Sequence, residues 1–476
     1  MAERPLPSLV AIDLGAESCR VSLLSSSGGR PQVRLVHRFP NAPEKRNGSL
    51  YWNLERILAG VEEGLRRAAT LAEGPVLSIG VDGWAVDYVR LNAQGSAIAP
   101  PFCYRDPRTE AMLMDIESRC TRERLFQMSG AQPLRINTQF QLMADQVAGV
   151  PAGTPWLNLP EYVLAKLGGR RVAEYTNATH TGLVDMERRM WCAEAFSLSG
   201  LAPEAAPQLV ATGTDLGKLR TMEGTGQAFR GTRLIATACH DTASAVAAIP
   251  LEGEDWAYIS SGTWSLVGTV LAHPVKSAHA CAAGFTNQGA AGDRVCFHKN
   301  VNGMWLLKQT HEQLCTYPSQ WPMEELMAAA ALQAPPRELL DVDAPELLLP
   351  GAMATRINIQ LRAQGAEPIA ETAEAMPIFA ALIFHSLAAR YARVLRDAEQ
   401  LTGRRFRRVV IVGGGSRNLL LNRLTAEATG LEVCCGARES ATIGNFAIQL
   451  AALEGAAYSG ARIAHWACVL AEIPGC

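Results

Sequence analysis

One short pattern occurs twice in this chain and restricts its possible folds more than any other feature. An apolar β-rich run, a turn of small polar residues and a second β-rich run occupy residues 9–13, 15–18 and 19–24, and the same arrangement returns at residues 256–260, 261–263 and 264–270. Each copy predicts a β-hairpin with a tight turn. Because roughly half the chain length separates the copies, we expect an internal duplication.

Helical periods lie around the two hairpins. Apolar residues at spacings of three and four predict helices at residues 54–73 and 377–401, and a third helix is expected at residues 418–429. The middle of the chain, residues 105–233, reads as helices, turns and loops with few strands. The whole pattern predicts an α/β protein.

The length of the chain predicts two domains. A chain of 476 residues exceeds what one hydrophobic core ordinarily holds, which favours two domains of roughly 200–250 residues each. The pattern changes near residues 245–255, so we place the domains at residues 1–248 and 249–476. A cleft between two such domains is the natural place to expect a site.

Charge and composition remove several classes of function. With 44 basic and 46 acidic residues, and with the basic run 404–408 leading straight into an apolar strand, no nucleic-acid surface is expected. No run approaches the roughly 20 apolar residues that cross a membrane, and no signal-peptide core precedes the first strand. The twelve cysteines are scattered without a C-x-x-C pair, which favours reduced thiols in the cytoplasm over structural zinc.

Two common nucleotide signatures are absent, yet three loops are suited to phosphate. Neither G-x-x-x-x-G-K-[ST] nor G-x-G-x-x-G occurs in the sequence. The turns at residues 15–18 and 261–263, and the glycine-rich loop 413–416 after a strand, combine small side chains with backbone N–H groups that phosphate oxygens can approach. Each loop alone is more typical of an ordinary turn, but three in one duplicated frame indicate nucleotide binding.

Two aspartates accompany these loops. Asp13 directly precedes the first turn, where a carboxylate can hold Mg²⁺ or simply initiate the turn. Asp241 lies in His240-Asp241-Thr242, between an apolar strand and a run of small residues that opens a helix. It is either a helix N-cap or the base that an attacking hydroxyl needs, because a protonated alcohol is a poor nucleophile.

With those residues identified, the chain resembles the FGGY carbohydrate kinases over almost its full length. The matching stretches are residues 11–20, 37–52, 81–88, 104–109, 239–246, 260–268, 285–289, 299–307 and 411–418. Within the family the stretches are most similar to the branch that phosphorylates L-rhamnulose. The resemblance implies two actin-like (ribonuclease H-like) ATPase domains that close on ATP and a sugar in a catalytic cleft.

The resemblance also implies a role for individual residues. Asp241 falls at the position of the family's catalytic base, whereas the Mg²⁺ position at Asp13 rests on its place before the first turn. The sugar-contacting positions are Ala85, His240, Thr242 and Asn300, and the ATP-binding positions are Ala16, Glu17, Ser18, Cys19, Arg20, Thr263, Lys308, Gly414 and Gly415. Arg20 would offer its guanidinium to the transferring phosphoryl group, although it could equally be a surface charge on a strand.

Four positions depart from the family pattern and bear on the substrate. Glu17 and Cys19 stand in the first loop, Lys308 stands where a glutamine usually contacts ATP, and Ala85 stands where a glycine usually lies near the sugar. From the resemblance we predict an ATP-dependent kinase that converts L-rhamnulose to L-rhamnulose 1-phosphate. We expect it to be a monomer or homodimer. Another ketose or polyol, such as L-fuculose or a xylulose-like sugar, is the alternative, and a non-catalytic sugar or nucleotide sensor on the same fold is the rival.

Overall fold

The chain forms two compact units, each assembled from segments that are separate in the sequence. The computed structural model describes residues 6–27, 30–250, 253–317, 319–437 and 439–471. The first unit comprises Met1–Glu252, Val270–Phe297 and Glu439–Cys476, and the second comprises Gly253–Thr269 and His298–Arg438. The expected division between residues 248 and 249 stays a prediction, and residues 251 and 252 of that region lie outside the described residues.

The sheet of the first unit contains the first predicted hairpin. Its strand order is β13-β14-β6-β1-β2-β3, and the strands are β1 (Ser8–Leu14), β2 (Ser18–Ser27), β3 (Arg30–Pro40), β6 (Val76–Gly83), β13 (Thr214–Lys218) and β14 (Arg233–Ala236). β1 pairs antiparallel with β2 and parallel with β6. The hairpin predicted at residues 9–24 is therefore confirmed, and β1 has a parallel neighbour on its other side.

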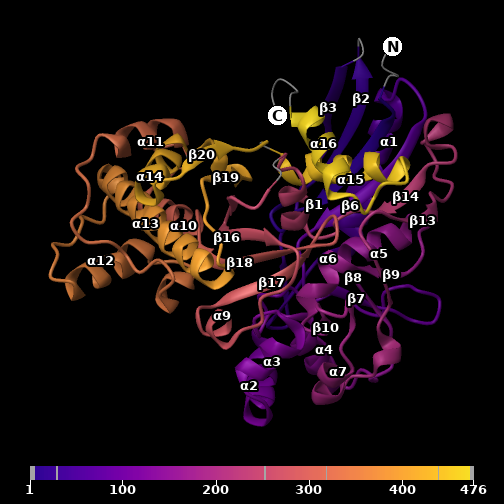
Figure 1. Ribbon diagram of the computed structural model, residues 1–476, viewed down its shortest axis with the longest axis horizontal. Coiled ribbons are helices and arrows are strands. Elements are labelled where there is room, and N and C mark those ends of the chain that lie inside the picture. Colours follow the sequence, from indigo (N-terminus) through magenta and orange to yellow (C-terminus); the bar gives the residue numbers. More distant parts are fainter. Residues whose placement is uncertain (1–5, 28–29, 251–252, 318, 438, 472–476) are drawn as a thin grey trace. The chain divides into compact units, whose positions relative to one another are not determined.

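Helices cover both faces of this sheet. On one face α1 (Leu54–Leu71) and α5 (Leu159–Lys166) join a hydrophobic cluster with Val10, Ile12 and Val21. On the other face α15 (Ser440–Leu453) packs on β1 and β6 (Figure 1) and against α8 (Asp241–Ala247). A Cβ atom on Gly444 would lie 1.8 Å from Ser244 O, so glycine is what permits α15 and α8 to approach this closely. The last helix of the described residues is α16 (Gly460–Ala471).

The middle of the chain is more strand-rich than its sequence indicates. The expected helices are present as α2 (Glu110–Arg119), α3 (Arg122–Ser129), α4 (Thr138–Val147), α6 (Tyr175–Ala178) and α7 (Ala193–Ser199). Between and before them lie short strands, namely β4 (Glu44–Arg46), β5 (Ser49–Tyr51), β7 (Tyr88–Arg90), β8 (Trp156–Asn158), β9 (Val172–Glu174), β10 (Val184–Asp185), β11 (Met190–Trp191) and β12 (Gln208–Val210). Apart from β7, which lies in the β-rich run 86–91, these strands of two or three residues are too short to give an alternating pattern, which explains why the sequence did not reveal them.

The second unit repeats the hairpin. β15 (Trp256–Ser261) pairs antiparallel with β16 (Trp264–Leu271) and parallel with β19 (Arg408–Val412), which pairs with β20 (Glu432–Cys435). β18 (Arg294–Asn302) lies on the other side of β16. As in the first unit, the first strand of the hairpin has an antiparallel partner on one side and a parallel partner on the other. The predicted duplication of strand, turn and strand is therefore confirmed at the level of strand pairing.

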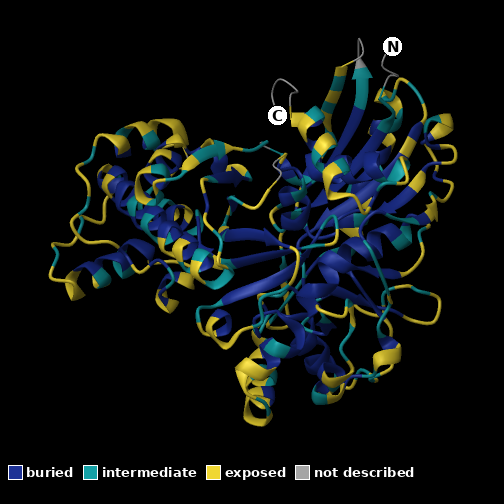
Figure 2. Ribbon diagram, in the orientation of Figure 1, coloured by how far each residue is buried: buried dark blue, intermediate teal, exposed yellow. Residues whose placement is uncertain are grey.

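The remaining helices of the second unit pack mainly around one long helix. α10 (Trp305–Leu314), α11 (Met323–Ala331) and α14 (Leu419–Thr429) contact α13 (Met376–Thr402), and α12 (Met353–Ala363) contacts α10. The span Ala373–Thr402 is long and apolar enough to cross a membrane by length and composition, but 72% of its most apolar window is buried inside the protein. Figure 2 shows α13 largely in dark blue, so it serves as the core helix of this unit.

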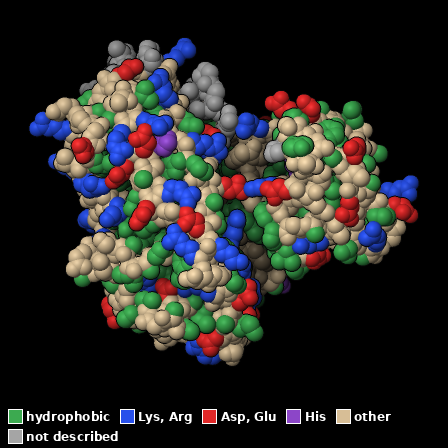
Figure 3. Space-filling model, turned by 180° about the vertical axis from the view of Figure 1, so that it is seen from behind, with side chains coloured by type: hydrophobic (Ala, Val, Ile, Leu, Met, Phe, Trp, Pro, Cys, Tyr) green, Lys and Arg blue, Asp and Glu red, His purple; other side chains and the backbone are tan. Residues whose placement is uncertain are grey.

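The charged side chains of the surface are mixed in sign. On the face shown in Figure 3, Lys and Arg side chains are interspersed with Asp and Glu side chains and with apolar ones. This agrees with a net charge of −2 from 44 basic and 46 acidic residues. A surface of this kind produces no strong field of one sign at long range.

Candidate active site

Three residues of neighbouring strands form the base of the candidate site. Asp13 in β1 is the cross-strand partner of both Arg20 in β2 and Asp82 in β6. Because directly paired residues point to the same face of a sheet, all three side chains face the side that α8 and α15 cover. Arg20 Nη1 lies 2.8 Å from Asp13 Oδ2, and Asn445 Nδ2 of α15 donates to Asp82 Oδ2 at 2.6 Å.

Asp241 is the first residue of α8 and belongs to the same face. The loop that precedes it is held beside β6, where Gly83 N donates to Cys239 O at 3.0 Å. His240 Nε2 lies 3.3 Å from Asp241 Oδ1, and Thr242 Oγ1 donates to the same oxygen at 3.2 Å. Both of these side-chain contacts fall on Oδ1, and 36% of the Asp241 side chain is exposed. One carboxylate oxygen is thus held by two neighbouring side chains, and the carboxyl group as a whole is partly accessible.

Burial raises the pKa of all three carboxyl groups, and the charge of Asp13 adds to the shift of the other two. Burial, followed by the negative charge of Asp13, raises the pKa of Asp241 to about 7. Burial and then Asp13 raise the pKa of Asp82 well above its ordinary value, and burial raises the pKa of Asp13 against the opposing charge of Arg20. Carboxyl groups that share a poorly solvated site cannot all ionise without a cation beside them. The site can therefore take up a proton near neutral pH or hold a positive ion.

The first turn is shaped by one glycine. A Cβ atom on Gly15 would lie 2.4 Å from Ser18 O, so only glycine fits this bend. Ser18 Oγ accepts hydrogen bonds from Arg38 at 3.2 and 3.1 Å, whereas Glu17 is exposed and Ala16 is half-buried. Cys19 is fully buried, its thiol donates to Gly15 O, and burial raises its pKa to about 12. Its thiol is therefore neutral and faces the core.

Ala85 lies in a strained turn. Trp84 N donates to Leu14 O at 3.1 Å, which places the turn at the end of β1. Val86 has a φ of 70°, a conformation that is a real outlier for a β-branched residue. Its carbonyl accepts from Thr138 Oγ1 at 2.7 Å and from Gln141 Nε2 at 3.2 Å. The turn that carries Ala85 is thus fixed from α4. Of the β-rich residues 86–91, only Tyr88–Arg90 form a strand, β7.

A buried aspartate organises the aromatic residues beside that turn. Trp52 Nε1 and Trp84 Nε1 donate to Asp87 Oδ2 at 2.5 and 2.9 Å, and Tyr104 N donates to the same oxygen at 3.3 Å. Burial raises the pKa of Asp87 to about 6 against these hydrogen bonds. Three of the stretches that carry the family resemblance, 37–52, 81–88 and 104–109, therefore converge on one carboxyl group.

The second turn is built by close backbone packing. A Cβ atom on Gly415 would lie 2.0 Å from Ser261 Oγ, and one on Gly303 would lie 2.8 Å from Gly262 O and from Thr263 O. Met304 N donates to Gly262 O at 3.0 Å, and Trp305 N donates to Thr263 O at 3.2 Å. The carbonyl groups of the turn are thus occupied by the start of α10, and Thr263 itself is only half-buried.

The other predicted residues of the second unit lie around this turn. Gly414 is exposed and begins the short 3₁₀ turn that contains Gly415, so the glycine-rich loop reaches the second turn through Ser261. Lys308 is exposed on the first turns of α10, whose start contacts Thr263. Asn300 is exposed on β18. The structure thus brings Thr263 and Gly415 together, with Lys308 on the helix that follows.

Sequence reasoning missed two residues of the first unit that contact its site. Asp82 ends a strand in the same way as Asp13, which was a detectable signal, but its place beside Asp13 depends on the parallel pairing of β1 with β6. Asn445 is 363 positions away from Asp82 in the chain, and no local pattern marks it. The contacts that place both residues in the site depend on the tertiary fold.

Asp13 and Asp82 fit a small hard cation. Asp82 Oδ1 is buried and has no hydrogen-bond partner among the described residues, and it is the cross-strand neighbour of a second carboxyl group. Within the same residues, no group of three or more His, Cys, Asp or Glu side chains could hold a metal ion alone. Mg²⁺ is ordinarily bound by one or two carboxylates together with water and substrate phosphates, so this donor set suits it.

Comparison with known proteins places both halves of the chain in one family. Residues 8–248 match the sequence model of the FGGY family of carbohydrate kinases, N-terminal domain, and residues 257–453 match that of the C-terminal domain. A rhamnulokinase of Enterococcus faecalis is 34% identical over 93% of this chain and 89% of its own length. A rhamnulokinase of Klebsiella pneumoniae is 37% identical over 94% of this chain and 89% of its own length.

Solved structures of other sugar kinases share the fold. A ligand-bound xylulose kinase of Lactobacillus acidophilus superposes with a TM-score of 0.76 at 14% identity, covering 97% of this chain and 92% of that one. Glycerol kinase of Plasmodium falciparum with ADP superposes with a TM-score of 0.72 at 13% identity, covering 98% of this chain and 92% of that one. At such identities the similarity concerns the fold, and it bears out the predicted two-domain actin-like architecture.

Proposed function

The chain belongs to the FGGY family of carbohydrate kinases, and we propose that it transfers the γ-phosphoryl group of ATP to a hydroxyl of L-rhamnulose, giving L-rhamnulose 1-phosphate. The sugar is inferred from the relatives named rhamnulokinase, which are 34% and 37% identical over most of the chain. The observation that carries the mechanism is the carboxyl group of Asp241, which is partly exposed and whose Oδ1 is held by the side chains of His240 and Thr242.

Asp241 is the proposed general base. Its pKa of about 7 lies close to ordinary working pH, which is the range in which a base is both ionised and able to hold a proton. As the sugar oxygen forms its bond to phosphorus, Oδ2 takes the hydroxyl proton. The bond from phosphorus to the bridging oxygen breaks, and ADP leaves with that electron pair.

The residues beside Asp241 are proposed to stabilise the phosphoryl group. Arg20 is 25% exposed and directed by Asp13, so its guanidinium has donors left for phosphate oxygens. Asp13, with Asp82 beside it, is the proposed holder of Mg²⁺, which when bound would neutralise phosphate charge. Because phosphoryl transfer has a loose transition state, positioning and electrostatics of this kind supply most of the acceleration.

The nucleotide is proposed to be held mainly by backbone groups. In the first unit these belong to Ala16, Glu17, Ser18 and Cys19; Cys19 would take part only through its backbone, because its side chain is buried. In the second unit the proposed contacts are Thr263, Lys308, Gly414 and Gly415, where small side chains leave the backbone accessible. The exposed ammonium group of Lys308 adds a positive charge that suits a triphosphate.

The sugar is proposed to contact four residues. The proposed contact of Ala85 is supported by the fixed conformation of its turn, in which Val86 O accepts hydrogen bonds from Thr138 and Gln141. His240 and Thr242 flank the base, and Asn300 is exposed on β18. The methyl group of Ala85 limits the space for the sugar, so this residue is where another ketose or polyol would be distinguished from L-rhamnulose.

The location and assembly of the enzyme are also proposals. We keep the cytoplasm as the expected compartment, supported by eleven described cysteines that are all free thiols. A monomer or a homodimer is the expected state, and sedimentation of the purified chain measures it directly.

Asp241→Asn tests the proposed base. The substitution keeps the size of the side chain and removes its basicity, so kcat should fall about a thousandfold, while the affinity for ATP is retained. Release of ADP in the presence of ketose measures turnover, and Asp293→Asn, an aspartate of the same unit in a remote ion pair, is the control. Turnover of Asp241→Asn near that of the unchanged protein would remove the assigned role.

A panel of sugars tests the proposed substrate. L-rhamnulose, L-fuculose, xylulose and matched polyols are compared by kcat/KM in the same ADP assay. We expect L-rhamnulose to give the highest value and ADP release without sugar to be negligible. Higher kcat/KM for another ketose would replace the substrate and leave the mechanism intact, whereas no ketose-dependent ADP release would favour a sensor on the same fold.

A further inference from the structure

We propose that His180 and Gln288 are positioning residues of the kinase, which act through His240 to direct an N–H group at Asp241. This inference rests on the proposed function of Asp241. Four side chains form one continuous row: Gln288, His180, His240 and Asp241. They come from β17 (Phe285–Ala290), from the short turn Thr179–Thr181, and from the start of α8. Gln288, His180 and His240 are each more than nine-tenths buried.

Two contacts of the row are hydrogen bonds, and the third is a short ion-pair contact. Gln288 Nε2 lies 3.1 Å from His180 Nδ1, and His180 Nε2 lies 3.0 Å from His240 Nδ1. His240 Nε2 then lies 3.3 Å from Asp241 Oδ1. Both nitrogens of each imidazole are therefore engaged in the row, and the two rings are only 3.9 Å apart at their centroids.

The carboxylate end of the row sets the direction of its hydrogen bonds, and the amide end is compatible with it. An ionised carboxylate can only accept, so the nitrogen of His240 that faces Asp241 must carry the proton. In a neutral imidazole the other nitrogen, His240 Nδ1, is then an acceptor. It must accept a hydrogen bond from Nε2 of His180, which therefore carries the proton of that ring. His180 Nδ1 is in turn an acceptor, and the amide nitrogen of Gln288 can donate to it. Four side chains thus give one consistent order of donors.

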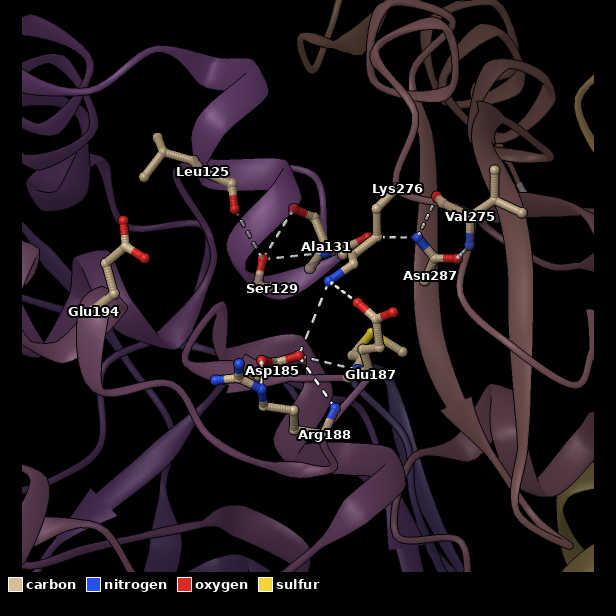
Figure 4. Close-up of polar contacts among 12 residues, drawn as sticks. Leu125, Ser129, Ala131, Asp185, Glu187, Arg188, Glu194, Val275, Lys276 and Asn287 are labelled. Atoms are coloured by element: carbon tan, nitrogen blue, oxygen red, sulfur yellow. Dashed lines mark hydrogen bonds and ion pairs between the residues drawn. The ribbon is translucent and has the colours of Figure 1, made fainter.

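The position of Gln288 is fixed by its neighbours on β17. Gly289 N donates to Thr179 Oγ1 at 2.9 Å, and a Cβ atom on Gly289 would lie 2.8 Å from the ring of Tyr175. On the other side of Gln288, Asn287 accepts from Val275 N at 2.8 Å and donates to Val275 O at 2.9 Å. Figure 4 shows the two hydrogen bonds between Asn287 and Val275. Lys276, the next residue, is directed at Glu187 and Asp185.

The row determines which oxygen of Asp241 is available. With the proton on His240 Nε2, Oδ1 receives hydrogen bonds from both His240 and Thr242, which stabilises the ionised form and leaves Oδ2 for the sugar hydroxyl. With the proton on Nδ1 instead, two lone pairs would face each other across 3.3 Å. The carboxylate would then rotate or take up a proton, and it would lose its function as a base.

The tautomers of the histidines provide the direct test. Nitrogen-15 NMR of the full chain with labelled histidine distinguishes ring nitrogens that carry hydrogen from those that do not. We expect His240 and His180 each to carry the proton on Nε2 and not on Nδ1. A proton on Nδ1 of His240, or on both of its nitrogens at pH 8, would overturn the proposal. This readout needs no substitution, so it remains informative even if a variant fails to fold.

Kinetics of Gln288→Met test the consequence. Methionine fills the space but donates nothing, so the preference for Nε2–H on His240 should weaken, and kcat should fall about tenfold with KM for ketose and ATP within about twofold. Gln139→Met removes another buried amide of the same unit, one that donates to Ser199 at 2.6 Å, and should leave kcat unchanged. Equal kcat in the two variants would contradict the proposal.

His180→Phe offers an independent check. Phenylalanine keeps the ring packing and removes both hydrogen bonds of His180, so kcat should fall at least as far as in Gln288→Met, again with little change in KM. Full activity in Asp241→Asn would remove the proposed function while leaving the tautomers as described. Loss of activity in Asp241→Asn together with unchanged kcat in both row variants would remove only this inference.

Discussion

The two hairpin turns share their strand pairing but differ in how they are built. In the first unit, the turn that follows Asp13 stands beside charged groups: Arg20 contacts Asp13 at 2.8 Å and Glu439 at 3.5 Å, and Asp82 lies on the next strand. In the second unit, the turn at Thr263 is surrounded by glycines whose missing side chains allow backbone to approach within van der Waals distance. The first turn is thus surrounded by charged side chains, and the second is surrounded by closely packed backbone.

This difference suggests a division of labour between the duplicated elements. Charged groups matter most where charge develops during the reaction, because pre-oriented charges stabilise a transition state more than a ground state. A turn made of backbone and glycine cannot do this, but it can fix the position of a nucleotide. Substitutions of the charged groups that contact Asp13 should therefore change kcat, and substitutions around the second turn should change stability and KM for ATP.

The largest effect is expected for Arg20→Gln. The substitution removes the positive charge that faces Asp13, so kcat should fall about a thousandfold with a smaller change in KM for ATP. Steady-state kinetics at saturating sugar measure both constants. Arg189→Gln is the matched control, since Arg189 forms an ion pair of the same length, 2.8 Å, with Asp293 in the same unit. A change confined to KM would mean that the first turn also acts only in binding.

Gly415→Ala should have the next largest effect and tests the second turn. The added Cβ would lie 2.0 Å from Ser261 Oγ and 2.6 Å from Ser261 Cβ, so the free energy of unfolding should fall by about 2 kcal/mol, with a higher KM for ATP. Urea unfolding measures the first quantity. Gly414→Ala is the control for stability, because a Cβ there would meet nothing within 4 Å, and it should change the free energy by less than about 0.5 kcal/mol.

A smaller effect is expected from pH, which should change the kinetics that depend on the first turn but not the ATP binding that depends on the second. Since burial and Asp13 raise the pKa of Asp241 to about 7, the base is protonated and inactive below that pH and ionised above it. We expect kcat/KM for the sugar at pH 6 to be about a tenth of its plateau value, whereas KM for ATP should stay nearly constant over the same range. A profile that is flat down to pH 5 would show that Asp241 titrates like an ordinary aspartate.

The sequence predicted the parts of this comparison that are local. Both hairpins, the long helix α13 and the position of Asp241 at a helix start follow from residue patterns within a few positions of each other. The family and its kinase activity are confirmed by the comparisons. The roles of individual site residues stay predictions, because no ligand contact tests them.

The parts of the site that the sequence did not predict depend on contacts between distant segments. Asp82 and Asn445 meet across 363 positions, and Gln288 and His180 meet across 108. Each of these residues is an ordinary buried polar group when its neighbours in the sequence alone are considered. Their meaning comes from sheet register and from the return of the chain to the first unit, which hydrophobic periods do not encode.

The smallest expected effect belongs to Glu17→Gln. Glu17 is an exposed acidic residue on the first turn, where its charge opposes that of a triphosphate without participating in the chemistry. Removal of the charge should lower KM for ATP about twofold at low ionic strength and have no measurable effect at about 0.5 M salt, because exposed charges are screened. Measurement of KM at both salt concentrations tests the assignment. A large fall in kcat would instead mean that Glu17 helps to hold Mg²⁺, and the charged turn would then include a third carboxylate.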